Sequence, residues 1–396
     1  MVPIILLPIV TAISLVACFS FWRSRGPLSE EKQPCISKKF SISLREKMPK
    51  KTLQLVAYLL IDTVMYMCIH IDLSYSAEAE DVESADWMMI DISTLRAATE
   101  DFAETRKLGE GGFGAVYKGT LPNGEEIAVK RMSKNSTQGV EELKNELALV
   151  AKLSHKNLVR LIGVCLEQQE RLLVYEFVPN RSLDHILFAL NGDLLDWAKR
   201  YKIIEGIARG LQYLHEDSQL KVVHRDMKAS NVLLDTNSIP KISDFGLAKI
   251  FGRDQTQGVT NRVVGTHGYM APEYMMRGNY SVKSDVFSFG VMVLEIVTGR
   301  KNNDHGSRQS EDLLTMVWEH WTNGTMLEVV DPSMNGCFSK EEVLKCVHIG
   351  LLCVQGNPAD RPMMSMVVMM LGSETFSLHV PSKPLFGSRT NDTDTD

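Results

Sequence analysis

The chain has 396 residues, of which 44% are hydrophobic and 23% charged, and its net charge is −6. This composition supports a sizeable core and excludes wholesale disorder and collagen-like repeats. The acidic balance argues against a dedicated nucleic-acid-binding protein, so we expect no nucleic-acid partner. Seven scattered cysteines without a C-x-x-C pair indicate neither a disulfide framework nor a zinc site.

The first 22 residues predict a transmembrane helix. They carry no charge, 19 of them are apolar when proline is counted, and Arg23 and Arg25 follow at once. Such a helix is ~33 Å long, which is enough to cross a hydrocarbon core of ~30 Å. A cleaved signal peptide is the alternative, but no basic segment precedes the apolar run. We therefore expect a single-pass protein of the plasma membrane whose later residues are cytoplasmic.

Residues 23–91 predict an atypical juxtamembrane region. Between residues 23 and 51 there are nine basic and three acidic side chains, a balance that suits anionic membrane lipid. A second apolar stretch covers residues 53–71 but contains Asp62 near its middle. Burying that charge in a bilayer costs ~2.5–3.5 kcal/mol. We favour one span, with residues 53–71 buried, interfacial or peculiar to this chain.

A glycine-rich motif follows at residues 108–116, where LGEGGFGAV contains the pattern G-x-G-x-x-G-x-V. Glycines let backbone N–H groups approach phosphates closely. The same pattern opens dinucleotide-binding folds, in which a helix follows the glycines. Here a strand continues to Gly119, a turn follows at residues 122–124, and a second strand ends at Lys130. This order predicts a hairpin over a phosphate group and argues against the dinucleotide-binding alternative.

Lys130 requires an anionic partner if it binds phosphate. The helix predicted over residues 140–153 offers Glu141, Glu142 and Glu146. Its apolar face is marked by leucine and valine side chains at helical spacing. The pattern alone leaves the choice among the three glutamates open.

Two further motifs carry the expected chemistry, HRDMKASN at residues 224–231 and DFG starting at Asp244. The motifs resemble those of protein kinases, which implies that Asp226 would accept a proton from, or orient, a substrate hydroxyl and that Lys228 would neutralise a transferred phosphoryl group. Asn231 and Asp244 would hold Mg²⁺ through oxygen atoms. We treat these four residues, with Lys130, as the candidate catalytic and metal-binding set.

These motifs together resemble those of protein kinases. The resemblance implies an α+β, bilobal fold with a sheet-rich N-lobe and a helical C-lobe, preceded by the transmembrane helix. It places the kinase domain at residues 92–371 and a disordered tail at residues 372–396. It also implies transfer of the ATP γ-phosphoryl group with Mg²⁺, or Mn²⁺, as cofactor, and it selects Glu146 as the partner of Lys130. Cytosolic ATP is a further reason to expect a single span.

Longer phrases at residues 91–99, 172–183 and 265–270 resemble plant receptor-like kinases of the cysteine-rich group. The resemblance implies phosphorylation of Ser or Thr in protein substrates and co-receptor kinases as partners. Such receptors carry a Cys-rich ectodomain before their span, so we expect that domain to be missing from this polypeptide. The implied ATP-binding residues, with Tyr175 as gatekeeper, are Leu108, Gly109, Gly111, Gly114, Val116, Ala128, Lys130, Tyr175, Glu176 and Val178.

Arg225, next to Asp226, implies regulation by phosphorylation of the activation segment, because a buried Arg favours an anion. Thr256, Thr260 and Thr266 are the candidates, and the resemblance favours Thr260 as phosphosite and Thr266 as part of the substrate groove. A scaffold without catalysis is the alternative from another class. Its usual marker is loss of the Lys, Asp or Asn named above, and this sequence retains all of them.

Scaffold residues are also implied by the resemblance. Asp285 would brace the catalytic loop, and Arg361 would pair with Glu273 at the end of the activation segment.

Overall fold

The computed structural model describes residues 88–384 with gaps. The gaps are 113, 134–142, 144, 148, 150–151, 168–169, 190–194, 253–254, 303–311 and 374–378. The transmembrane helix predicted at residues 1–22 and the apolar stretch at 53–71 lie outside the described residues. Among the helices that are described, none combines the length and the apolar character needed to cross a bilayer.

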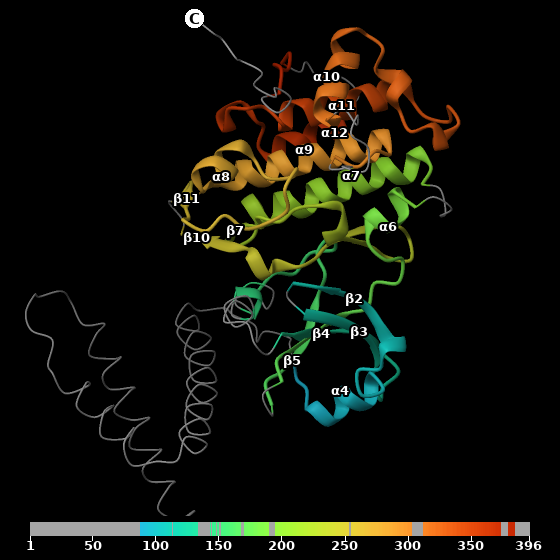
Figure 1. Ribbon diagram of the computed structural model, residues 1–396, viewed down its shortest axis with the longest axis vertical. Helices are drawn as coiled ribbons and strands as arrows, with labels where there is room; N and C mark the ends of the chain where they lie inside the picture. The colour runs from blue at the N-terminus through green and yellow to red at the C-terminus, as the bar shows by residue number, and fades with distance from the viewer. Residues whose placement is uncertain are drawn as a thin grey trace, which may run out of the picture. The chain divides into compact units, whose positions relative to one another are not determined.

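Figure 1 shows the strands β2–β5 gathered with α4 at one end of the described part, and the larger helices at the other. The strands and helices of the first part are β1 (Met88–Met89), α4 (Ile92–Ala98), η2 (Glu104–Arg106), β2 (Lys107–Gly111), β3 (Gly114–Thr120), β4 (Glu126–Met132), β5 (Leu161–Cys165) and β6 (Leu172–Glu176).

The sheet has six strands in the order β1-β5-β6-β4-β3-β2, and every neighbouring pair is antiparallel except β1 with β5. The predicted hairpin is present, because β3 and β4 pair from Gly114↔Met132 to Thr120↔Glu126. Gly124 adopts a φ of 86° in the turn, a conformation that glycine tolerates best. The sheet begins at Met88, before the predicted start of the domain at residue 92.

Helix α4 covers one face of this sheet. Asp91 caps its first turn by accepting a hydrogen bond from the backbone N–H of Thr94 at 2.9 Å. Its buried residues Ile92 and Leu95 join the apolar cluster that contains Ile127 and Val129 of β4. Because β4 is fixed from this side, the side chain of Lys130 has a defined position in the sheet.

The remaining elements form the helical lobe. They are α6 (Leu183–Leu187), α7 (Trp197–Gln212), η3 (Tyr213–Asp217), β7 (Lys221–Val223), η4 (Ala229–Asn231), β8 (Val232–Leu234), β9 (Pro240–Ile242), η5 (Phe245–Leu247), β10 (Lys249–Phe251), β11 (Gly258–Val259), α8 (Pro272–Arg277), β12 (Asn279–Tyr280), α9 (Val282–Thr298), α10 (Leu313–Thr322), η6 (Met326–Val329), η7 (Pro332–Met334), α11 (Lys340–Cys353), η8 (Pro358–Asp360) and α12 (Met364–Gly372).

Helix α9 is the centre of this lobe. A capping box joins Ser281 and Ser284 at its start, and all but one of its residues are buried. It packs against α11, while α12 packs against α7. A helix buried on every side is a rigid support, and the catalytic loop and the activation segment both bond to it, as described below.

Part of the predicted disordered tail is described. Gln355 donates a hydrogen bond to the carbonyl oxygen of Ser382 at 2.9 Å and accepts one from the backbone N–H of Ser382 at 3.1 Å. His348 also contacts the carbonyl oxygen of His379 at 2.7 Å. Residues 379–384 therefore lie against the end of α11. Their composition does not reveal this contact, because it depends on the position of Gln355.

Candidate active site

Lys130, Glu146 and Asp244 form a charged chain between the two lobes. The Nζ of Lys130 lies 2.9 Å from Glu146 Oε2 and 2.7 Å from Asp244 Oδ1. Lys130 and Glu146 are both buried. Burial lowers the pKa of Lys130, but the two carboxylates outweigh this effect and raise its pKa above the ordinary value. The lysine is therefore held in its charged form.

The pKa of Asp244 is set by the same two effects as that of Lys130, with the opposite sign. Burial raises the pKa of its carboxyl, yet the nearby Lys130 ammonium outweighs burial and leaves the pKa below the ordinary value. Its backbone adopts a left-handed conformation, with φ 64° and ψ 70°. Such strain in a residue other than glycine is tolerated where the surroundings fix it, and it is common at functional sites.

Tyr175 adds a contact that the sequence reasoning missed. Its hydroxyl donates a hydrogen bond to Glu146 Oε1, so Glu146 is held by Tyr175 and Lys130 together. Burial, and then the Glu146 carboxylate, raise the pKa of Tyr175 well above its ordinary value, so the phenol stays protonated. No sequence signal gives this bond, because it depends on two rotamers meeting across the sheet and the helix.

Replacing Tyr175 by Phe should measure how much the hydrogen bond between Tyr175 and Glu146 stabilises the fold. A hydrogen bond to a charged group contributes about 1.5–3 kcal/mol, so we expect Tyr175→Phe to lower the free energy of unfolding by that amount. Urea unfolding followed by circular dichroism measures it. Tyr213→Phe is the matched control, because the Tyr213 hydroxyl accepts a hydrogen bond from the neutral backbone N–H of Ser154 at 3.2 Å, and its loss should lower the free energy of unfolding by only about 0.5–1.5 kcal/mol. Equal losses for the two variants would contradict the assignment.

The glycine-rich motif spans the end of β2 and the start of β3. A Cβ atom added at Gly109 or Gly111 would meet no heavy atom within 4 Å, so the backbone there is open to a ligand. At Gly114 the φ is 137° and an added Cβ would lie 2.0 Å from the carbonyl oxygen of Arg131, so only glycine fits. The motif is therefore open at Gly109 and Gly111 and tightly packed against β4 at Gly114.

The other residues predicted to bind ATP are spread over strands of the same sheet. Val116 pairs with Lys130, and Ala128 pairs with Tyr175. Leu108 of β2 is half exposed, and Val178, just after β6, is buried. The side chain of Glu176 bonds to Lys241 and to the backbone N–H of Arg160, at 2.8 Å each. The backbone N–H of Glu176 also donates to the carbonyl oxygen of Arg160 at 3.0 Å, so both its side chain and its N–H are engaged.

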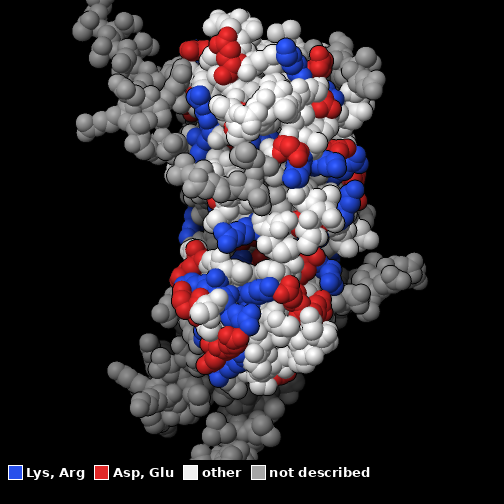
Figure 2. Space-filling view, turned by 90° about the vertical axis from the view of Figure 1, so that its right-hand side faces the viewer, with Lys and Arg blue, Asp and Glu red and all other residues white. Residues whose placement is uncertain are grey.

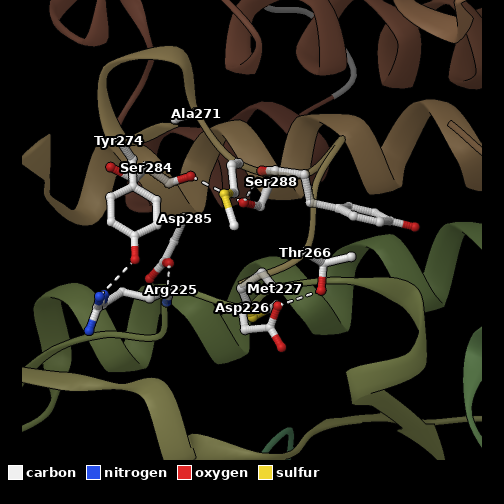
Figure 3. A pocket seen from close by; sticks show the side chains of 11 residues that line it. Arg225, Asp226, Met227, Thr266, Ala271, Tyr274, Ser284, Asp285 and Ser288 are labelled. Carbon is white, nitrogen blue, oxygen red and sulfur yellow. Dashed lines mark hydrogen bonds between the residues drawn. The ribbon is translucent and has the colours of Figure 1, made fainter. Parts of the chain in front are cut away.

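Three polar side chains surround Asp226 of the catalytic loop (residues 224–231): Lys228 and Asn231 from the same loop and Thr266 from the activation segment. The Oδ2 of Asp226 lies 2.9 Å from Lys228 Nζ and 3.2 Å from Asn231 Nδ2, and its Oδ1 accepts a hydrogen bond from Thr266 Oγ1 at 2.7 Å. Figure 3 shows Thr266 and Asp226 facing each other. Lys228 also donates to Thr266 at 3.0 Å. Thr266 therefore occupies one oxygen of the Asp226 carboxylate and also accepts a hydrogen bond from Lys228.

Asp285 holds this loop in place, as the resemblance implied. Its carboxylate accepts hydrogen bonds from the backbone N–H groups of His224 at 2.7 Å and Arg225 at 2.9 Å. His215 contacts the same carboxylate at 2.9 Å. Arg225 has a φ of 70°, so the loop turns sharply just before Asp226. Because Asp285 lies in the first turn of α9, the buried helix fixes the turn.

Arg225 lies against the activation segment. Its guanidinium donates to the hydroxyl of Tyr274 at 2.7 Å and the carbonyl oxygen of Leu247 at 3.2 Å, and it stacks over the ring of Tyr280. Its buried Nε has no hydrogen-bond partner. In the part of the chain that the structure describes, Arg225 forms no ion pair with a carboxylate. The guanidinium thus retains a capacity for an anion.

The candidate phosphosites differ in accessibility. Thr256 is exposed, whereas Thr260 is half-buried. The backbone N–H of Thr260 bonds to the carbonyl oxygen of Gly278 at 3.0 Å, and its side-chain oxygen bonds to the backbone of Arg262. Phosphorylation of Thr260 therefore requires its side chain to leave Arg262.

The donor set fits a magnesium ion. Asn231 Nδ2 donates to the carbonyl oxygen of Asp226 at 2.8 Å, an orientation that leaves the amide oxygen for a metal. Asp244 supplies a carboxylate with one oxygen engaged by Lys130. Hard oxygen ligands from one or two residues, completed by phosphates and water, are typical of Mg²⁺ sites. Among the described residues no cluster of three or more His, Cys, Asp or Glu suggests a site held by protein alone.

Comparison with known families agrees with this geometry. The model of the protein kinase domain matches residues 102–368, and the chain belongs to this family. It is 64% identical over 316 residues to cysteine-rich receptor-like protein kinase 6 of Oryza sativa subsp. japonica, covering 79% of this chain and 46% of that protein. Cysteine-rich receptor-like protein kinase 10 of Arabidopsis thaliana is 56% identical over 325 residues, which is 80% of this chain and 48% of the relative. The chain thus spans about half the length of these curated relatives.

Proposed function

We propose that this chain is a membrane-anchored serine/threonine protein kinase that transfers the γ-phosphoryl group of ATP to protein substrates. One observation carries the proposal: Lys130, Glu146 and Asp244 form one charged chain, and Asp226, Lys228 and Asn231 form a second group on the adjoining loop. Phosphoryl transfer needs little covalent chemistry from the protein. It needs positioned charges and a group that receives the hydroxyl proton.

The protein substrate would place its hydroxyl beside Asp226. The Asp226 carboxylate orients the hydroxyl and receives its proton, while Lys228 balances the charge of the transferred group. Thr266, which contacts both residues, borders the acceptor position. A substrate side chain must share Asp226 with Thr266, so the segment that carries Thr266 sets how the substrate lies.

ATP would lie under the glycine-rich motif, with its adenine at the backbone of residues 176–178. Lys130 binds phosphate oxygens, and Glu146 keeps its ammonium group in place. A Mg²⁺ ion held by Asn231 and Asp244 would neutralise phosphate charge. Lys130 bonds to Asp244 in the structure. Phosphate binding would therefore weaken the bond between Lys130 and Asp244 and replace it with bonds from Lys130 to phosphate oxygens.

Regulation would act through Arg225. Phosphorylation of Thr260, or of Thr256, adds a charge of about −2 that a guanidinium with a free Nε can bind. Such a contact would tie the activation segment to the catalytic loop. The similar plant proteins are receptor-like kinases by name, which supports placement in receptor-like signalling, with co-receptor kinases as candidate partners.

Membrane anchoring by residues 1–22 belongs to the same proposal and rests on their uncharged, apolar sequence. The basic residues between positions 23 and 51 would contact anionic lipid on the cytoplasmic side. Tags at the two ends of the chain, tested for accessibility in sealed vesicles, check this topology. A C-terminal tag found outside the cytosol contradicts it.

The catalytic proposal is tested with the purified full chain, Mg²⁺ and radiolabelled ATP. We expect autophosphorylation and transfer to myelin basic protein, with label on Ser and Thr in phosphoamino-acid analysis. Label on Tyr alone contradicts the proposed specificity. Absence of transfer by a preparation that is folded and stabilised by nucleotide contradicts catalysis and favours a scaffold.

A further inference from the structure

Residues 379–384, with the sequence HVPSKP, form a segment without helix or strand that the proposed reaction does not use. Pro381 and Pro384 are buried, whereas Ser382 and Lys383 between them are exposed. Val380, just before the first proline, is 87% exposed. The two prolines are therefore the side chains through which this segment packs on the helical lobe.

The spacing of the two prolines fits a polyproline II helix. A proline ring fixes its own φ near about −65°, and the residue before each proline is confined to extended conformations. A polyproline II helix has about three residues per turn, so side chains three positions apart lie on one face. Pro381 and Pro384 share such a face, and it is the buried one. The segment thus has the Pro-x-x-Pro form that peptide-binding grooves recognise.

Gln355, just after α11, binds the backbone between the two prolines. Its Nε2 donates to the carbonyl oxygen of Ser382 at 2.9 Å, and its Oε1 accepts from the backbone N–H of Ser382 at 3.1 Å. Its Nε2 also donates to the carbonyl oxygen of Leu351 at 2.8 Å. The amide is buried, and both of its donor hydrogens and its oxygen are engaged. Because both bonds to the segment go to backbone atoms, Gln355 recognises the path of the chain and not the Ser382 side chain.

His348 of α11 makes a further contact with the backbone of the segment. Its Nε2 lies 2.7 Å from the carbonyl oxygen of His379, and because a carbonyl oxygen can only accept, Nε2 is the donor. The His348 ring lies against Trp321 of α10, with the ring centroids 5.1 Å apart. His379 and Ser382 are three positions apart, the same period as the prolines. Backbone bonds and buried rings therefore both follow the repeat of a polyproline II helix.

Charge does not account for this contact. Lys383 is the one Lys, Arg, Asp or Glu of the segment, it is exposed, and among the described residues none forms an ion pair with it. Figure 2 shows acidic and basic side chains interspersed over one face of the described part, without a large patch of a single sign. The segment is held by proline packing and by hydrogen bonds to its backbone.

Gln355 also contacts the ion pair at the end of the activation segment. Its backbone carbonyl oxygen accepts a hydrogen bond from Arg361 Nε at 2.7 Å. Arg361 in turn pairs with Glu273. The side chain of Gln355 thus binds the segment, while its carbonyl binds Arg361. A substitution of the side chain alone can therefore separate the two contacts.

We propose that the end of α11, with Gln355 and His348 as its binding residues, is a docking site for a Pro-x-x-Pro peptide in the polyproline II conformation, and that residues 379–384 of the same chain occupy it. A segment joined to its site by a short stretch of chain has an effective concentration on the order of 1 mM, so modest contacts fill the site. A peptide from outside must compete with the chain's own segment. The inference goes beyond the proposed kinase function and does not depend on it.

Hydrogen exchange of the full chain, resolved to single residues by mass spectrometry with fragmentation, tests the docking. We expect the backbone N–H of Ser382 to exchange at least about tenfold more slowly than in the free peptide HVPSKP, because it is bonded to Gln355 whenever the segment is docked. Gln355→Met keeps a side chain of similar length but removes both bonds to Ser382, and should restore the rate of the free peptide. Gln257→Met, at an exposed glutamine, is the matched control and should leave the protection unchanged.

The dependence on proline is tested in the same assay. The double variant Pro381→Ala with Pro384→Ala removes both buried rings, and its Ser382 should exchange at the rate of the free peptide HVASKA. Free HVPSKP at about 10 mM, above the effective concentration of the tethered segment, should speed the exchange of Ser382 in the wild type, whereas HVASKA should not. Thermal melting reports whether each variant is folded.

Each outcome supports or overturns the inference. Exchange of Ser382 in the folded wild type at the rate of the free peptide overturns the docking. Protection that survives Gln355→Met overturns the assigned site, and protection that survives the double proline variant overturns the Pro-x-x-Pro requirement. Equal effects of the two added peptides also overturn it. None of these measurements involves phosphoryl transfer, so the proposed function stands or fails on its own assay.

Discussion

Replacing Asp226 by Asn is expected to lower kcat for protein phosphorylation by about 10²–10⁴-fold, the range that a positioned general base contributes. The carboxylate has one oxygen toward Lys228 and Asn231 and the other toward Thr266. Asparagine keeps this shape, but it cannot receive a proton from the substrate hydroxyl. Its NH₂ group can only donate, so it must face the Thr266 hydroxyl, which can accept, while its amide oxygen faces the donors Lys228 and Asn231.

ATP binding should survive the change. The bonds of Lys130 to Glu146 and Asp244 do not involve the Asp226 side chain. We therefore expect nucleotide to raise the melting temperature of Asp226→Asn as much as that of the wild type. This separates a loss of catalysis from a loss of folding.

Asp101→Asn is the matched control, because Asp101 is exposed and lies on the sheet lobe after α4. It should retain full activity in the same assay with radiolabelled ATP. If Asp226→Asn keeps a kcat within threefold of this control, Asp226 is not the base and the proposed mechanism fails.

The parts of the site that are formed by neighbouring residues could be predicted from the sequence. The hairpin around residues 122–124 follows from the strand that continues after the glycines and from the turn-forming Pro, Asn and Gly, and the structure has it as β3 and β4. The spacing of leucines on the following helix identified three candidate glutamates. Only the resemblance selected Glu146, which the structure places 2.9 Å from Lys130. Periodicity defines a face, but it does not identify which residue on that face meets a partner.

Contacts between side chains that are far apart in the sequence could not be predicted. Tyr175 was expected only to border the nucleotide, yet its hydroxyl is bound to Glu146. Glu295 lies in the largely apolar helix α9, and its sequence does not show that the carboxylate accepts a hydrogen bond from the Tyr269 hydroxyl. These pairs are separated by 29 and 26 residues, and no local pattern encodes which rotamers point together. Contacts of this kind require the packed fold.

The buried ion pair between Arg361 and Glu273 should have the largest effect on stability. Two parallel bonds of 2.8 Å join the guanidinium to the carboxylate. Arg361 is fully buried and also donates to the carbonyl oxygens of Gln355 at 2.7 Å and Lys283 at 2.9 Å. Removing one partner of such a pair leaves an uncompensated charge. We expect Glu273→Met to lower the free energy of unfolding by about 3–5 kcal/mol, as measured by urea denaturation.

A double variant distinguishes a penalty for an unpaired charge from a loss of packing. The double variant Glu273→Met with Arg361→Met carries neither charge. We therefore expect it to lower the free energy of unfolding by much less than the sum of the two single effects. The exposed pair Glu205 and Arg209 on α7 is the control, since its N–O distance of 2.6 Å is short but water surrounds it. Disrupting this exposed pair should lower the free energy of unfolding by about 0.3–0.5 kcal/mol.

Additive losses at the buried pair would contradict this account, because they would mean that each side chain acts through its own packing. The distinction matters for the active site. Glu273 closes the activation segment, and Arg361 ties it to Lys283 at the start of α9, the helix that also carries Asp285 and Glu295. The same helix also bonds to the backbone of His224 through Asp285 and to Tyr269 of the activation segment through Glu295. An unpaired Arg361 should loosen the end of that segment before the lobe unfolds, so activity should be lost at lower urea concentration than helical structure.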